Sequence, residues 1–163
     1  MVDLSNRPKM EEVYPFILES IKDGGQFVLF PRGTSMNPTI YEGKDCVVLE
    51  ETTQPQLFDI VLYRRKSGQF VLHRIMRIKN GKYTMCGDNQ YLFEYGIEKE
   101  QIIAVVKEVR KSDGNIFDTD KIHKDGEKFI NMPEKKRKRI LYPLIIIKRK
   151  LKCIAKLLKK QNN

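Results

Sequence analysis

The spacing of apolar residues changes near residue 25, and this change divides the chain. Between residues 8 and 23 the apolar positions recur at helical spacing, and Gly24-Gly25 follows as a stop. The apolar residues of this segment are Val13, Phe16, Ile17 and Ile21. We therefore expect a short amphipathic helix within an N-terminal segment, residues 1–25.

From Gln26 onward, short apolar runs alternate with turn residues, a pattern typical of strands. The runs expected to form strands are 27–30, 46–49, 59–63, 70–78, 82–86 and 102–109. Asn80-Gly81 indicates a two-residue hairpin, because both central positions of a type I′ turn have positive φ. Many short strands with tight turns favour a mainly β fold, built on an antiparallel coiled sheet.

Residues 110–133 are polar and rich in turn residues, so we expect a hairpin or loop that closes the sheet at the end of a body domain, 26–133. Beyond it, a helix is expected from Pro143, since proline suits a first helical turn. Its apolar stripe would consist of Ile147, Leu151, Ile154 and Leu158. The sequence thus predicts a basic amphipathic C-terminal helix in a tail, residues 134–163.

Charge separates the body from the tail. The chain carries a net charge of +10, but residues 134–163 hold 12 Lys and Arg against one Glu, which leaves residues 1–133 close to neutral. This split makes nucleic acid an unlikely partner of the body and favours an anionic membrane surface for the tail. The alternative is a terminal helix that packs on the domain and leaves its basic face in solvent.

Composition limits the remaining classes. The 163 residues suffice for one domain with a tail, and 32% charged residues are typical of a soluble globular protein. A run of about 18 apolar residues is absent, as is an N-terminal secretory h-region, so we expect peripheral membrane association on the cytoplasmic side. Three widely spaced cysteines (Cys46, Cys86 and Cys153) and only two histidines indicate neither a disulfide framework nor a metal site, and no cofactor is expected.

Three residues could carry chemistry. Ser35 follows Gly33 in a turn that could expose its hydroxyl, His73 lies within a predicted strand on the face opposite Leu72 and Arg74, and Asp88 follows a strand end. A hydroxyl, a base and an orienting acid are the parts of a serine hydrolase site. Each residue also has an ordinary structural interpretation, as a turn former or a buried strand residue.

Four ordered sequence boxes strengthen the catalytic interpretation. They are G-T-S-M-N-P-T-I at 33–40, F-D-I-V-L-Y at 58–63, F-V-L-H-R-I at 70–75 and G-D-N at 87–89. In this order and spacing they resemble the conserved boxes of the type I signal peptidase family, which is related to the LexA-like self-cleaving peptidases. The resemblance covers residues 27–109 and implies a signal-peptidase or LexA-like β fold.

The resemblance also implies roles for the site residues. Ser35 matches the nucleophile, and His73 matches the base of the endoplasmic-reticulum and archaeal type, where typical bacterial members have Lys. Asp88 is the preferred orienting acid, and Glu94 is its competitor. The chain departs from the family at Phe58 and at Ala104, each of which stands where glycine is usual. We also expect no counterpart of the family's N-terminal transmembrane anchor, whose place the basic tail could take.

The leading hypothesis is a serine endopeptidase of signal-peptidase type that cleaves leader or signal peptides at a membrane surface. A LexA-like self-cleaving regulator is a second hypothesis, although residues 1–25 are short for a DNA-binding module and that type has Lys at the His73 position. A third is an inactive, membrane-bound peptide-binding module. The identity of the substrate, the side of the membrane and the oligomeric state stay open.

Overall fold

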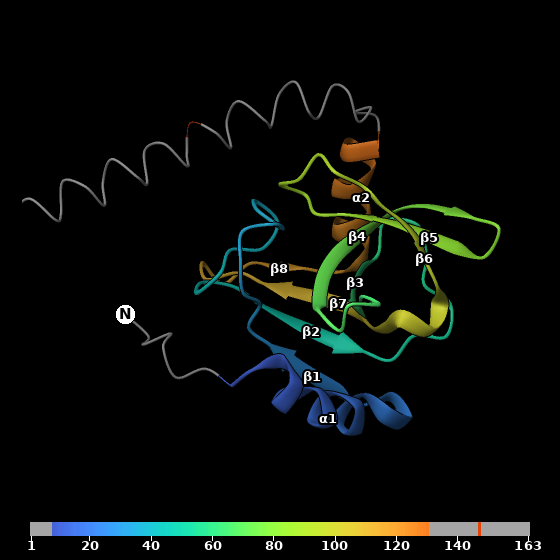
Figure 1. Ribbon diagram of the computed structural model, residues 1–163. Coiled ribbons are helices and arrows are strands. Elements are labelled where there is room, and N and C mark those ends of the chain that lie inside the picture. Colours follow the sequence, from blue (N-terminus) through green and yellow to red (C-terminus); the bar gives the residue numbers. More distant parts are fainter. Residues whose placement is uncertain (1–7, 131–146, 148–163) are drawn as a thin grey trace, which may run out of the picture.

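The computed structural model describes residues 8–130 and residue 147, and its centre is one antiparallel sheet of eight strands. The strands follow the order β1-β2-β7-β3-β4-β5-β6, and β8 pairs with β7 (Figure 1). Their bounds are β1 Gln26–Leu29, β2 Cys46–Glu50, β3 Ile60–Arg64, β4 Phe70–Lys79, β5 Lys82–Cys86, β6 Glu94–Ile97, β7 Ile102–Arg110 and β8 Ile116–Phe117. Register shifts in four of the pairings, typical of β-bulges, allow the sheet to bend and coil.

Within the described residues, two α-helices accompany the sheet (Figure 1). Helix α1, Met10–Ile21, contacts β1 and buries Ile17 and Ile21. Helix α2, Thr119–Ile130, contacts β4, β7 and β8. Two short 3₁₀ turns, Lys22–Gly24 and Lys99–Gln101, complete the described elements.

The coiled sheet has a core on each face. The first core contains Leu62 and Val106 together with Ile17 of α1 and Ile122 of α2. The second contains Val61, Tyr63, Ile75 and Met85. Because side chains alternate along a strand, Leu72 packs against the first core while His73, beside Tyr63, lies on the second face, as the sequence predicts.

The predicted fold class is confirmed. All six predicted strands are present with ends within one residue of the expected ones, and the N-terminal helix is present as α1. Asn80 and Gly81 have φ of 51° and 70°, as a type I′ hairpin requires. No helix within the described residues is long and apolar enough to cross a membrane. The helix predicted from Pro143 lies, apart from Ile147, outside those residues.

One strand, β6, and one helix, α2, were not predicted. Residues 94–97 contain Gly96 and show no apolar run, yet they form β6. The hairpin expected at the start of residues 110–133 is present as β7-β8, and the helix α2, for which no prediction was made, follows it. The Asp118 side chain accepts a hydrogen bond from the Lys121 N–H at 2.9 Å and caps this helix.

Phe58 takes a left-handed conformation, with φ of 75°, just before β3. An ordinary side chain in this region costs about 1–2 kcal/mol, and glycine does not. The backbone here therefore has the conformation that glycine, usual at this position of the family resembled, would adopt without strain.

Candidate functional site

The structure brings the serine turn and the Gly87-Asp88-Asn89 turn together. The Asn89 N–H donates to the Ser35 carbonyl at 2.8 Å, and the Asn89 side-chain amide donates to the Thr34 carbonyl at 3.0 Å. Ser35 itself is half-buried. Two sequence boxes separated by about fifty residues thus form one local structure.

Gly87 lies between Ser35 and His73. A side-chain carbon at Gly87 would be 3.1 Å from His73 Nε2, 3.1 Å from Ser35 Cβ and 2.6 Å from the Ser35 carbonyl oxygen. The absence of a side chain here lets the hydroxyl-bearing residue and the imidazole approach the same point. Among the described residues no hydrogen bond yet joins Ser35 to His73, and catalytic hydrogen bonds commonly tighten only when substrate binds.

His73 is buried, with 2% of its surface exposed. Its Nδ1 lies 3.2 Å from Glu94 Oε1 and 3.3 Å from the Tyr63 hydroxyl. Burial lowers the pKa of His73 to about 4, and the nearby Glu94 carboxylate opposes this shift only in part. The imidazole is therefore neutral at pH 7 and can accept a proton at Nε2.

Arg65 holds Glu94 in place. Its Nε and Nη2 donate to the two carboxylate oxygens at 2.7 and 2.5 Å, a two-pronged geometry that fixes a carboxylate in both position and orientation. Burial alone would raise the pKa of Glu94, but hydrogen bonds from Arg65 and Tyr63 lower it below its usual value. Glu94 thus presents a negative charge to His73 Nδ1.

Sequence reasoning missed Tyr63 and Arg65. Tyr63 lies two residues from Val61, the partner of His73 in the β3-β4 register, and so shares its face of the sheet. Alternation within the F-D-I-V-L-Y box indicates this face, but only the strand register places Tyr63 next to His73. Arg65 follows β3, and nothing in the sequence around it indicates a contact with Glu94.

Asp88 has a different environment. Its carboxylate accepts hydrogen bonds from Arg74 Nε and Nη2 at 2.9 and 2.7 Å and from the Thr39 hydroxyl at 2.5 Å. The side chains of Asp88 and Arg74 are both 0% exposed. Within the described residues Asp88 makes no hydrogen bond to His73. The contacts therefore place Glu94, the competitor, against the imidazole, and Asp88 in a buried ion pair behind the turn.

Replacing Asp88 with asparagine is expected to lower the free energy of unfolding by about 3–5 kcal/mol, because the Arg74 charge would stay buried without its counter-charge. Urea unfolding followed by circular dichroism measures this loss. The control is Asp120→Asn on the exposed surface of α2, for which a change within about 0.5 kcal/mol is expected. An Asp88→Asn protein as stable as the parent would contradict this role.

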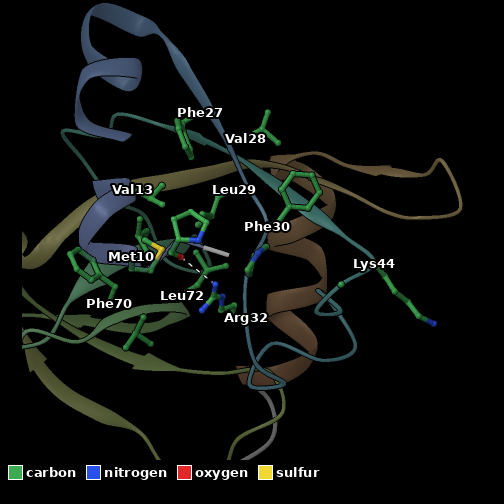
Figure 2. A pocket seen from close by; sticks show the side chains of 15 residues that line it. Met10, Val13, Phe27, Val28, Leu29, Phe30, Arg32, Lys44, Phe70 and Leu72 are labelled. Carbon is green, nitrogen blue, oxygen red and sulfur yellow. Dashed lines mark hydrogen bonds between the residues drawn. The ribbon is translucent and has the colours of Figure 1, made fainter. Parts of the chain in front are cut away.

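An apolar pocket of about 520 Å³ lies beside β1 (Figure 2). Its lining includes Met10 and Val13 of α1, Phe27 and Leu29 of β1, and Phe70 and Leu72 of β4. The lining residues Pro31 and Arg32 follow β1 and precede the serine turn in the chain. Leu72 packs against the first core, so it lines the pocket from the face of the sheet opposite to His73.

No metal site is evident in the part of the chain that the structure describes, because no three His, Cys, Asp or Glu side chains are grouped to hold an ion. Cys46 and Cys86 form no disulfide within the described residues.

A coiled antiparallel sheet that places a serine turn beside a buried, carboxylate-bound histidine is the arrangement of a serine-peptidase-type hydrolase. A model of the Peptidase S24-like family matches residues 4–110, about two thirds of the chain, and the chain belongs to this family. Comparison with curated proteins and with solved structures finds no match.

Proposed function

We propose that this protein is a serine endopeptidase of signal-peptidase type that cleaves leader or signal peptides through Ser35, His73 and Glu94. The observation that carries the proposal is the junction of Ser35 and His73 at Gly87, with Glu94 bound to the far side of the imidazole. A nucleophile, a neutral base and an anchored acid are the groups that a serine peptidase with a catalytic triad uses.

In this mechanism the Ser35 hydroxyl attacks the scissile carbonyl while His73 Nε2 takes its proton. Glu94 stabilises the imidazolium and keeps the proton of the neutral ring on Nδ1. The Ser35 backbone N–H stabilises the oxyanion, and His73 then gives its proton to the leaving amine. Water, deprotonated by His73, hydrolyses the acyl-enzyme and releases the second product.

The substrate is proposed to bind as an extended strand beside β1. This strand ends the sheet order, so its outer edge has no strand partner among the described residues. Backbone hydrogen bonds to this edge would hold the peptide, and the pocket beneath it would receive an apolar side chain near the cut. An apolar leader segment has the chemistry that such a pocket accepts.

Membrane association is proposed to come from residues 134–163, whose 12 Lys and Arg against one Glu favour the anionic cytoplasmic leaflet. Peripheral binding there would concentrate the peptidase near leader segments. Co-sedimentation with vesicles containing anionic lipid, with zwitterionic vesicles as the control, tests this part independently of cleavage.

Cleavage of a leader-peptide library by the full chain tests the proposed activity. Products identified by mass spectrometry should share apolar residues on the acyl side of the cut. Cleavage at unrelated positions, or none on leader peptides while other peptides are cut, would contradict this specificity.

The pH dependence of kcat/KM is expected to follow the buried histidine. Since His73 must be neutral to accept a proton and its pKa is lowered to about 4, activity should be lost only as pH falls through about 4. Hydrogen bonds from Arg65 and Tyr63 lower the pKa of Glu94 below its usual value, and Glu94 contacts His73, so the acid limb belongs to the pair.

Stability must be followed in the same experiment. The unfolded chain takes up the His73 proton at about 6.5, before the folded chain does, so stability falls between about pH 6.5 and pH 4. Circular dichroism at each pH separates unfolding from titration. An acid limb centred near 6.5 in a folded protein would contradict a buried, neutral base.

Self-cleavage of LexA type is a second candidate, favoured by the family match, since that family includes the self-cleaving proteins. Incubation of the purified chain separates the two activities. Self-cleavage within one molecule is first-order and independent of protein concentration, whereas cleavage of a separate leader peptide depends on both concentrations.

A further inference from the structure

Helix α2 packs behind the site although it lies beyond the matched part of the family. The family model ends at residue 110, and α2 begins at Thr119. Ile122 of this helix is nonetheless 1% exposed and belongs to the first core. The helix is therefore an integral part of this domain, and its contacts lead toward the catalytic turn.

Arg74 connects α2 with that turn. Its Nη1 donates to the carbonyl of Ile122 in α2 at 2.7 Å and to the carbonyl of Phe58 at 3.0 Å. Its Nε and Nη2 bind the Asp88 carboxylate. Because a guanidinium is planar and rigid, carbonyls that fix one nitrogen also fix the two that hold Asp88.

The neighbours of Asp88 contact the nucleophile directly. Gly87 packs against Ser35 and His73, and the Asn89 N–H binds the Ser35 carbonyl at 2.8 Å. A shift of α2 would therefore displace Arg74 and, with it, Asp88. The backbone of Gly87 and Asn89, on either side of Asp88, would then move against Ser35.

A steric fit sets the distance between α2 and the sheet. A side-chain carbon at Gly126 would lie 2.7 Å from Phe58 Cβ, closer than such atoms approach. Phe58 is the residue that replaces the usual glycine and adopts a φ of 75°. A large residue on the sheet side thus meets the one helix position without a side chain. His123 of α2 adds a contact to Asp59 at 2.7 Å.

We propose that α2 is a positioning clamp: the fit of Phe58 against Gly126 seats the Ile122 carbonyl on Arg74, which holds the Gly87-Asp88-Asn89 turn against Ser35. The effect on kcat rests on the proposed peptidase function. The effect of α2 on the position of the Gly87-Asp88-Asn89 turn does not.

Three variants of the full chain test the fit: Gly126→Ala, Phe58→Gly and the two combined. Gly126→Ala should lower kcat by on the order of tenfold to a hundredfold, because small displacements of reacting groups have effects of that size. KM should stay unchanged, since the apolar pocket is lined by other elements. In the Phe58→Gly protein the aromatic ring is absent, so the methyl group that Gly126→Ala adds makes no clash. The combined variant should therefore have the same kcat as Phe58→Gly. Lys124→Ala, on the exposed surface of α2, is the control and should match the parent.

Hydrogen exchange at the Asn89 amide measures how firmly the turn is held against Ser35, and it needs no substrate. Gly126→Ala should accelerate this exchange on the order of tenfold, and the combined variant should exchange as Phe58→Gly does. If Gly126→Ala does not fold, His123→Ala, which removes a contact without adding a clash, should accelerate Asn89 exchange instead.

Unchanged kcat and unchanged Asn89 exchange in Gly126→Ala would overturn the proposal, as would an equal loss in the Phe58→Gly background. For a non-folding Gly126→Ala, unchanged exchange in His123→Ala overturns it. A parent chain that cleaves no peptide would contradict the proposed function, while Asn89 exchange would still decide for or against the clamp.

Discussion

Replacing Ser35 with alanine is expected to reduce the rate of leader-peptide cleavage by roughly 10⁴-fold or more, because the acyl-enzyme can no longer form. The fold should persist. Ser35 is half-buried, and the hydrogen bond that joins its turn to Asn89 uses the backbone carbonyl, which alanine retains. Cleavage rates with excess enzyme, read by mass spectrometry, measure the loss.

The matched control is Thr34→Ala. Thr34 is the exposed neighbour whose contact with Asn89 likewise uses a backbone carbonyl, so its loss should leave kcat near that of the parent. Equal urea midpoints for the parent and both variants would exclude unfolding as the cause. Cleavage that persists in Ser35→Ala at the parent rate would remove Ser35 as the nucleophile.

Much of the fold could be predicted because apolar runs and turn residues within residues 26–110 mark most strands by short-range patterns. The strands that carry apolar runs, and the Asn80-Gly81 hairpin, have short-range signals that tertiary contacts reinforce. Residues 94–97 lack such a run. They form β6 because they pair with β5, a long-range contact that the local sequence does not indicate. Because glycine has a low helix propensity, Gly126 makes a helix at 119–130 difficult to predict from the sequence. Burial of Ile122 and the packing of Gly126 against Phe58 nevertheless stabilise α2.

The site was predictable in part for a related reason. Ser35 and His73 belong to sequence boxes with distinctive residues, and the structure brings both to Gly87. The choice between two acids depends on which carboxylate each arginine binds. Arg74 binds Asp88, and Arg65 binds Glu94. Both pairings are long-range contacts made by strand register, so no spacing along the chain distinguishes them.

Replacing Glu94 with glutamine is expected to lower kcat by roughly 10²–10⁴-fold, because an amide neither stabilises the imidazolium nor keeps the ring proton on Nδ1. KM should change little, since Glu94 does not line the apolar pocket. The Glu94 carboxylate raises the pKa of His73, so any residual activity should show an acid limb at lower pH than the parent. Stopped assays across pH 3.5–8 with a leader peptide measure both effects.

Arg65→Lys should have a smaller effect in the same direction. Lysine retains the charge but loses the two-pronged contact that orients Glu94, so kcat should fall by roughly tenfold or more at unchanged KM. Glu100→Gln, an exposed carboxylate beyond β6, is the control for charge alone. The opposite pattern would exclude Glu94 as the acid. If Glu94→Gln kept the parent kcat and its pH profile, Glu94 would only neutralise Arg65.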